Sequence, residues 1–193
     1  MLSNLDKYKI ILASGSPRRR ELMTGLGVNY EVKTLPGIDE SYPSTLKGEE
    51  IPLYIAKEKA AAYLSHIRPD ELIITADTIV WIEQTVLGKP SDNEQAKAML
   101  RRLSGKTHEV ITGVCLTTTE FQQSFTTTTE VTFASLTEDE ITYYVENYHP
   151  LDKAGAYGIQ EWIGFVGVTG IQGSYFNVMG LPIQRLYKEL AKL

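Results

Sequence analysis

An apolar run, "LIITADTIVWI" at residues 72–82, is the feature that most limits what this chain can fold into. Its β-branched and aromatic residues predict a buried strand. Asp77 interrupts the run, and a buried carboxylate is costly unless it meets a cation, a metal or water. We therefore expect Asp77 to face one of these. A structural salt bridge with a nearby lysine is the alternative to a functional role.

Strands and helices alternate along the chain. Apolar and β-branched runs predict strands near residues 9–13, 30–35, 72–82, 109–118, 125–134 and 163–169. Helical patterns cover about residues 17–25, 49–67, 92–103, 137–148 and 182–192. Two of these helices have capping boxes, Ser91 with Glu94 and Thr137 with Glu140. The alternation predicts an α/β fold, and the adjacent strands around residues 109–134 predict a hairpin and hence a mixed sheet.

Charge and composition exclude several classes of function. The chain has 193 residues and a formal net charge of −5, so no overall positive field favours nucleic acid or a membrane. The single cysteine, Cys115, favours a reducing compartment and is expected to be a buried small residue. The N-terminus lacks the apolar core of a signal peptide, and no run approaches membrane-spanning length. We predict a cytoplasmic protein.

The stretch "ILASGSPRRRELM" at residues 11–23 places three arginines where a helix should begin. Ser16 fits the N-cap and Pro17 the first helical position, so Arg18, Arg19 and Arg20 fall in the first turn. Cations are disfavoured beside this positive end of the helix, whereas an anion is favoured. An anion site is one interpretation, and three solvated arginines are the other. The three cannot all face one ligand.

Further candidates lie in two other segments. Glu40 sits in a polar turn and, paired with Asp77, would suit Mg²⁺. In the helix expected at residues 49–67, Lys57 and Lys59 flank the apolar stripe on opposite sides, and helical geometry does not choose between them; Glu58 points away. The core stripe of this helix is expected to comprise Leu53, Ala56, Ala60, Tyr63, Leu64 and Ile67.

Two loops and three histidines contain the remaining candidate residues. Lys89 lies between Gly88 and Pro90, where a phosphate contact or plain exposure are both possible roles. Gln160 ends "LDKAGAYGIQ", and its amide has the donor and acceptor needed to pair with a base edge. The histidines lack metal-ligand spacing and are expected at the surface or as caps: His66, His108 and His149.

Taken together, these segments resemble the Maf family, the septum-formation-associated nucleoside triphosphate pyrophosphatases. The resemblance rests, in order along the chain, on "LASGSPRRREL", "IDE", "AKEKA", "ADTIV", "GKP", "LSGKTHEVITGV", "PLDKAGAYGIQ" and "GSYFNVMGLP". The similarity is to the dTTP/UTP-type branch. It implies a single domain over residues 1–193, a central mixed sheet flanked by helices, and two lobes around a deep substrate cleft. It also implies a homodimer.

The resemblance further implies cleavage of a nucleoside triphosphate to the monophosphate and pyrophosphate with a divalent cation, Mg²⁺ or Mn²⁺. Removal of non-standard nucleotides and an arrest of cell division are the implied cellular roles. Asp77 would accept a proton from water, or act mainly as a metal ligand with Glu40. Arg18, Thr78 and Gln160 match positions tied to substrate choice. The positions that match phosphate contacts are Ser14, Arg18, Arg19, Lys59 and Lys89.

Three other functions compete with this one. The first is hydrolysis of a purine or a modified nucleoside triphosphate, which activity measurements on a panel of nucleotides would reveal. A non-catalytic nucleotide sensor that regulates septation is a different class, and the acidic and basic residues around Asp77 argue against it because a sensor needs no base. A phosphopeptide-binding module is the weakest of the three.

Overall fold

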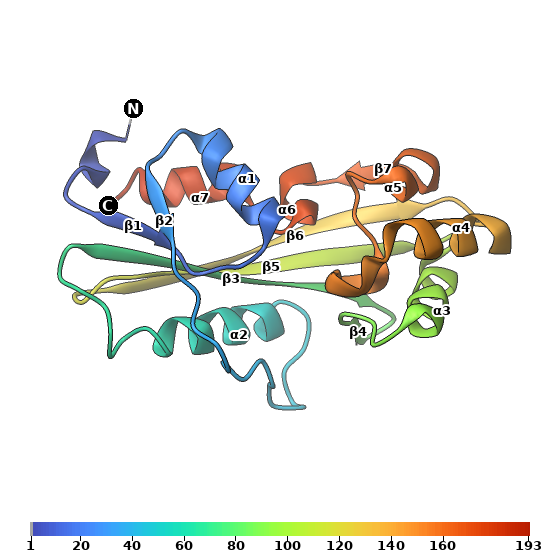
Figure 1. The fold of residues 1–193 in the computed structure, drawn as a ribbon, viewed down its shortest axis with the longest axis horizontal. Helices are drawn as coiled ribbons and strands as arrows, with labels where there is room; N and C mark the ends of the chain where they lie inside the picture. The colour runs from blue at the N-terminus through green and yellow to red at the C-terminus, as the bar shows by residue number, and fades with distance from the viewer. Residues whose placement is uncertain (1) are drawn as a thin grey trace. The chain divides into compact units, whose positions relative to one another are not determined.

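The structure is a computed structural model that describes residues 2–193. Its strands, labelled in Figure 1, are β1 (Lys9–Leu12), β2 (Tyr30–Val32), β3 (Glu71–Ile82), β4 (Thr85–Leu87), β5 (Thr107–Thr117), β6 (Gln122–Phe133) and β7 (Val168–Gln172). Its α-helices are α1 (Pro17–Leu26), α2 (Glu50–Ala61), α3 (Asn93–Leu103), α4 (Glu138–Tyr148), α5 (Trp162–Gly167), α6 (Tyr175–Met179) and α7 (Ile183–Leu190). Short 3₁₀ turns are η1 (Ser3–Leu5), η2 (Pro150–Asp152) and η3 (Ala154–Ala156).

The strands form one mixed sheet in the order β2-β1-β3-β5-β6-β7, and β4 pairs with β3. Strand β1 runs parallel to both of its neighbours, with Ile10 beside Tyr30 on β2 and beside Leu72 on β3. Strands β4 and β7 are antiparallel to β3 and β6. The predicted hairpin is confirmed, since β5 and β6 are neighbours joined by a turn in which Thr118 donates to Phe121 O at 2.9 Å. The α/β class and the mixed sheet are therefore confirmed.

Contacts within the chain group into two compact units. The first comprises the residues up to Asp77 together with Thr112–Thr127 and Gly180–Leu193. The second comprises Thr78–Ile111 and Thr128–Met179. The division falls inside β3, between Asp77 and Thr78, so the strand contributes residues to both units.

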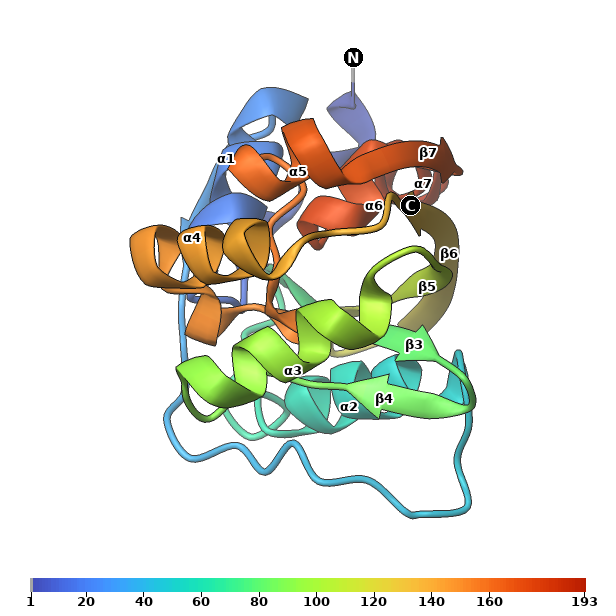
Figure 2. The same cartoon turned by 90° about the vertical axis from the view of Figure 1, so that its right-hand side faces the viewer.

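In the first unit, helices cover both faces of the sheet. Helices α1 and α7 pack together on one face, and α2 lies on the other, as the two views in Figures 1 and 2 show. Side chains on both faces of β1 and β3 are consequently buried, including Ile11, Leu12, Leu72 and Ile73. A strand buried on both faces has a continuous apolar sequence, which explains why residues 72–76 are almost all apolar.

Helix α2 lies unusually close to the sheet because small residues face it. Ala56 and Ala60 on the helix pack with Cys115 on β5. Thr75 on β3 donates from its hydroxyl to the carbonyl oxygen of Ala56 at 2.7 Å. A Cβ atom placed on Gly113 of β5 would lie 2.4 Å from the carbonyl oxygen of Pro52, nearer than atoms pack in proteins. Only glycine permits this approach.

In the second unit, α3 packs on α4, and an aromatic cluster lies in the interior. His108, Phe133 and Tyr157 meet edge to face with ring centroids 5.0–5.4 Å apart. Gly155 adopts a positive φ of 67°, and a Cβ on it would lie 2.8 Å from the side chain of Val80. This residue must therefore be glycine on two counts.

Two expected elements differ from the structure. The strand expected at residues 163–169 is wrong over most of its length, because α5 occupies residues 162–167 and β7 begins at Val168. The helix expected to reach residue 67 ends at Ala61, and turns follow. Leu64, expected in the core stripe, is 52% exposed as a result. Tyr63 remains buried because it packs with Ile11 and Ile73.

Two local predictions about side chains also fail. Helix α3 is capped by Asp92, which accepts from the backbone N–H of Gln95 at 2.8 Å, and not by Ser91. His108 is only 2% exposed, whereas a surface or capping position was expected. His149 does cap α4, and the capping box of Thr137 with Glu140 is confirmed.

Candidate functional site

The N-terminus of α1 is built as its sequence predicts. Ser16 is the N-cap, its hydroxyl accepts from the backbone N–H of Arg19 at 3.5 Å, and Pro17 is the first helical residue. Gly27 ends the helix in the left-handed conformation, with φ of 74°. Ser14 is buried between β1 and this helix, and its hydroxyl accepts from the N–H of Ser16 at 3.3 Å. The result is a strand, a short turn and a helix start, an arrangement suited to anions.

Arg19 lies across the first unit and joins three of its segments. Its Nε donates to Gly180 O at 2.7 Å, and its Nη1 donates to Ala76 O at 2.9 Å and to Ser14 Oγ at 3.4 Å. Burial lowers the pKa of Arg19, while the nearby charge of Asp77 opposes that shift. The guanidinium stays charged, because its ordinary pKa is so high. Arg19 therefore places a positive charge beside Ala76, the residue that precedes Asp77.

Lys59 joins the two candidate carboxylates. Its Nζ lies 2.8 Å from Asp77 Oδ1 and 2.9 Å from Glu40 Oε1. The side chains of Lys59 and Asp77 are each 13% exposed, and that of Glu40 is 50% exposed. The sequence leaves open whether Asp77 meets a cation, a metal or water; in this structure it meets Lys59. Ion pairing with a lysine is also what the purely structural alternative predicts.

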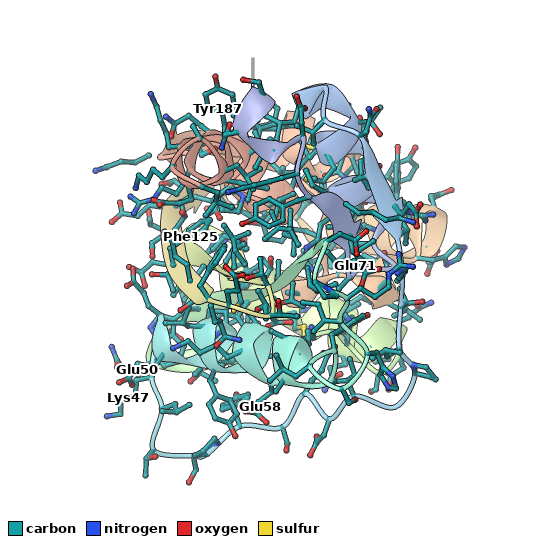
Figure 3. All side chains as sticks on the ribbon, turned by 90° about the vertical axis from the view of Figure 1, so that its left-hand side faces the viewer. Lys47, Glu50, Glu58, Glu71, Phe125 and Tyr187 are labelled. Carbon is teal, nitrogen blue, oxygen red and sulfur yellow. The ribbon has the colours of Figure 1, made fainter. Side chains whose placement is uncertain are left out.

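The structure distinguishes the two lysines that the helical pattern could not. Lys59 points to Asp77, whereas Lys57, two residues earlier on α2, is exposed. Glu58 between them is also exposed and points away from the sheet, as Figure 3 shows. The expected direction of Glu58 is thus confirmed. Of the three charged residues, only Lys59 contributes to the candidate site.

Glu40 reaches Lys59 from the segment between β2 and α2. Its neighbour Asp39 accepts from the backbone N–H and the hydroxyl of Ser41 at 2.8 and 2.7 Å, which lowers the pKa of Asp39. The Asp39 carboxylate is therefore committed to its own turn. Near the start of the same segment, the Tyr63 hydroxyl donates to Lys33 O at 2.8 Å and accepts from the N–H of Leu35 at 3.1 Å.

The remaining arginines of α1 differ in exposure. Arg18 is half-buried, and Arg20 is exposed and donates to Gly15 O at 3.3 Å. The first unit therefore contains most of the predicted positions: Ser14, Arg18, Arg19, Glu40, Lys59 and Asp77. Among residues 2–193, no group of three or more His, Cys, Asp and Glu side chains is arranged to hold a metal ion.

The second unit contains the other three predicted positions. Thr78 is half-buried on β3, and Lys89 is exposed after β4. Gln160 lies in a turn, and its Oε1 is buried without a hydrogen-bond partner among residues 2–193. A buried acceptor of this kind is uncommon in native proteins and requires an explanation.

One group of polar residues around Gln160 escaped the sequence analysis. Lys153 is only 7% exposed and lies 3.2 Å from Glu161 Oε1, and Tyr144 donates to the other oxygen of Glu161. A signal existed in the sequence, because Lys153 stands in the small-residue stretch "LDKAGAYG" much as Asp77 stands in an apolar run. Tyr144 and Glu161 carried no comparable signal, since each lies among ordinary helix and turn residues.

Comparison with known proteins supplies an independent test. A family model described as Maf-like protein matches residues 9–193. The dTTP/UTP pyrophosphatase of Phocaeicola vulgatus is 70% identical over 193 residues and covers 100% of both chains. That of Bacteroides thetaiotaomicron is 66% identical over 193 residues, again with 100% of both chains covered. That of Porphyromonas gingivalis strain W83 is 53% identical over 192 residues, covering 98% of this chain and 96% of the relative.

A solved structure resembles the fold at a much greater distance. The structure of a HAM1 protein from Coxiella burnetii matches with a TM-score of 0.51 and 15% sequence identity, covering 96% of this chain and 100% of that chain. At this identity the match supports the fold alone. Within residues 2–193, no helix has both the length and the apolar character needed to cross a membrane.

Proposed function

Because this chain belongs to the Maf family, we propose that it is a nucleoside triphosphate pyrophosphatase that hydrolyses dTTP and UTP to the monophosphate and pyrophosphate. The relatives that support this substrate choice match the chain from end to end. We extend their activity to this protein as a hypothesis, and the geometry around Asp77 is the structural observation that carries it.

That observation is the convergence of Glu40 and Asp77 on Lys59. The ammonium of Lys59 lies 2.8 Å from the carboxylate of the buried Asp77 and 2.9 Å from that of Glu40. The guanidinium of Arg19 is fixed next to this group by its bond to Ala76 O. A triphosphate carries several negative charges, and cations near the reacting phosphate stabilise both the bound substrate and the charge that develops during transfer.

In the proposed reaction, Asp77 accepts a proton from the attacking water. The water oxygen bonds to the α-phosphorus, the bond from that phosphorus to the bridging oxygen breaks, and its electron pair leaves with pyrophosphate. Lys59 and Arg19 are assigned to phosphate charge, together with Arg18, Ser14 and the N–H groups at the start of α1. By motif, we also assign Lys89 to phosphate binding and Thr78 and Gln160, with Arg18, to substrate choice.

The donor set fits a divalent cation that arrives with the substrate. Glu40 and Asp77 both direct an oxygen at one cationic atom, so their spacing suits a shared cation. The described residues add no third acidic or histidine ligand, and Mg²⁺ typically takes one or two protein carboxylates with substrate phosphates and water. Glu40 and Asp77 would hold the ion. When bound, it would neutralise phosphate charge and polarise the scissile bond.

A nucleotide panel tests the proposal. Pyrophosphate release is measured for dTTP, UTP, CTP, ATP, GTP and modified triphosphates, with Mg²⁺, with Mn²⁺ and with chelator. We expect release to be fastest with dTTP and UTP and to require the metal. Preference for a purine or modified nucleotide would contradict the substrate assignment, and binding without any release would favour a nucleotide sensor. The homodimer implied by the family is a separate proposal, tested by the mass of the protein in light scattering.

A further inference from the structure

Gln160 is the third residue of a four-residue turn in the second unit. The backbone N–H of Glu161 donates to Gly158 O at 3.0 Å, which closes the turn. The side-chain Oε1 of Gln160 is buried and accepts no hydrogen bond from residues 2–193. Burying an unpaired acceptor costs free energy, so the surrounding structure must hold this side chain in place.

A chain of polar contacts holds both ends of that turn. The backbone N–H of Gly158 donates to the hydroxyl of Tyr144 at 3.0 Å, and the same hydroxyl donates to Glu161 Oε2. The other carboxylate oxygen, Oε1, lies 3.2 Å from Lys153 Nζ. Lys153 also donates to Asp152 Oδ1 at 2.7 Å. Gly158 and Glu161, the first and last residues of the turn, are thus both bonded to Tyr144 of α4. Glu161 is also paired with Lys153 of the loop that follows α4 (orange in Figure 1).

The donors and acceptors that these groups offer fix the direction of each hydrogen bond. A phenol has one proton to donate, and here Glu161 receives it while Gly158 supplies the bond that the hydroxyl oxygen accepts. Burial raises the pKa of Tyr144, and its bond to Glu161 raises it further, so the hydroxyl remains a donor throughout the usual pH range. Glu161 is held at both oxygens, by Tyr144 and by the ammonium of Lys153. Charge-assisted bonds of this kind are the stronger class.

Gly158 lies next to the side chains of both Gln160 and Glu161. A Cβ atom on Gly158 would lie 2.9 Å from Cδ of Glu161 and 3.1 Å from Nε2 of Gln160. The amide of Gln160 and the carboxylate of Glu161 therefore rest against the same glycine. A shift of the Glu161 side chain would therefore change the packing at Gly158, against which the Gln160 amide rests.

We propose that Tyr144, Lys153 and Glu161 are positioning residues that orient the amide of Gln160 and so set the base selectivity of the enzyme. The inference rests on the proposed function, in which Gln160 acts on base choice. None of the three residues needs to touch the nucleotide. Their role is to keep the donor and acceptor of Gln160 in one orientation, since a misplaced polar group recognises a base edge poorly.

The test compares two variants with a matched control. Tyr144→Phe removes one buried hydroxyl from the network, and Glu161→Gln keeps the shape of the side chain but removes its charge. Tyr157→Phe is the control, because it also removes a buried hydroxyl, one that is bonded to His108 at 2.7 Å in the same region. We expect both network variants to lower the ratio of kcat/KM for UTP to that for ATP about tenfold. The control should leave that ratio unchanged.

A double-mutant cycle separates positioning from general damage to the fold. We expect Gln160→Ala to lower the selectivity ratio, and Glu161→Gln to have no further effect on that ratio in the Gln160→Ala background. Additive losses, or an equal loss in Tyr157→Phe, would overturn the proposal. So would an unchanged ratio in Gln160→Ala or in Glu161→Gln. If Tyr144→Phe does not fold, the Glu161→Gln cycle decides alone.

Failure of the proposed function gives a different result. A wild-type protein that does not release pyrophosphate, or that releases it equally from UTP and ATP, would refute the activity or its selectivity before any variant is compared. A selective wild type with insensitive network variants would refute only the positioning role.

Discussion

Lys59 on α2 lies with its ammonium 2.8 Å from the carboxylate of Asp77 on β3, although the two residues are 18 positions apart in the chain. The contact depends on how near α2 comes to the sheet, which the small residues between them permit. Both side chains are largely buried, so the pair is shielded from the solvent that weakens surface ion pairs. The same lysine also meets Glu40. Single substitutions can remove the charge of Lys59, Asp77 or Glu40 separately.

We expect Asp77→Asn to lower turnover about 100-fold or more, because the amide keeps the shape of the side chain but cannot accept the proton. Nucleotide binding should survive, measured by calorimetry. Asp70→Asn is the matched control, because Asp70 directly precedes the same strand and its side chain is 62% exposed. Recovery of activity in Asp77→Asn at raised Mg²⁺ would instead identify Asp77 as mainly a metal ligand.

Lys59→Met should lower kcat/KM roughly ten- to a hundredfold, since a bond between charged groups contributes about 1.5–3 kcal/mol. The change removes the cation between Glu40 and Asp77 and leaves two carboxylates close together. Lys57→Met, on the same helix but exposed, should change kcat/KM less than twofold, about the effect of an ordinary surface substitution. Equal effects of the two substitutions would show that overall charge, and not the position of Lys59, is what matters.

The three consecutive arginines of α1 should behave differently. Arg19→Ala should lower the free energy of unfolding by about 2 kcal/mol or more, because it removes bonds to Gly180, Ala76 and Ser14. Arg18→Ala should leave stability unchanged and lower kcat/KM ten- to a hundredfold, roughly the contribution of one charge-assisted phosphate contact. Arg20→Ala should do little to either quantity. Urea unfolding and pyrophosphate release measure both.

For Arg19 this expectation departs from the helix-dipole argument, which treats every cation in the first turn as mildly unfavourable without ligand. Two of the three acceptors of Arg19, the carbonyl oxygens of Gly180 and Ala76, come from distant parts of the chain, and the sequence gives no sign of them. A stable Arg19→Ala protein would mean that these bonds contribute little. A large loss of stability in Arg18→Ala would mean that Arg18 has a structural role and would remove it from the phosphate site.

His108 should make the protein less stable in mild acid. Burial lowers its pKa from 6.5 to about 4, so between these values the unfolded chain binds a proton that the folded chain does not. Stability therefore rises with pH across this window and falls as pH drops from 6.5 towards 4. The loss attributable to His108 between pH 7 and pH 5 is about 2 kcal/mol.

The comparison with His108→Gln isolates this contribution, because glutamine does not titrate. Unfolding in urea is measured at pH 7 and pH 5 for both proteins. The wild type should lose about 2 kcal/mol more than the variant over that interval. Identical losses in the two proteins would place the pKa of His108 near its ordinary value in the folded state.

Local signals predicted the elements whose ends carry strong stop and start residues. Helix α1 is the clearest, because Ser16, Pro17 and Gly27 mark its limits whatever the rest of the chain does. Where such residues are missing, prediction fails. The run "IGFVG" is too short for its periodicity to separate helix from strand, and the chain forms α5 there. Helix α2 has no glycine or proline at its end, so its early stop at Ala61 could not be foreseen.

The candidate site shows the same limit. Asp77 is conspicuous because a buried charge among apolar residues needs a partner of opposite charge. Which lysine pairs with it depends on how α2 packs on the strands that it faces. Lys57 and Lys59 are equivalent on a helical wheel and differ only once α2 is packed. Of the network around Glu161, a sequence pattern marks only Lys153, because the members come from a helix, a loop and a turn and meet only after folding.

Gly113 has no functional group, yet its small size sets the distance between α2 and β5, on which the contact between Lys59 and Asp77 depends. Its hydrogen faces the backbone of α2 at Pro52, where a methyl group would not fit. Any larger residue would move α2 away from β5. Lys59, seven residues after Pro52 on this helix, would then move away from Asp77. Sequence variation at residue 113 should therefore be restricted as tightly as at a catalytic position, and an inactive variant there would retain every reacting group.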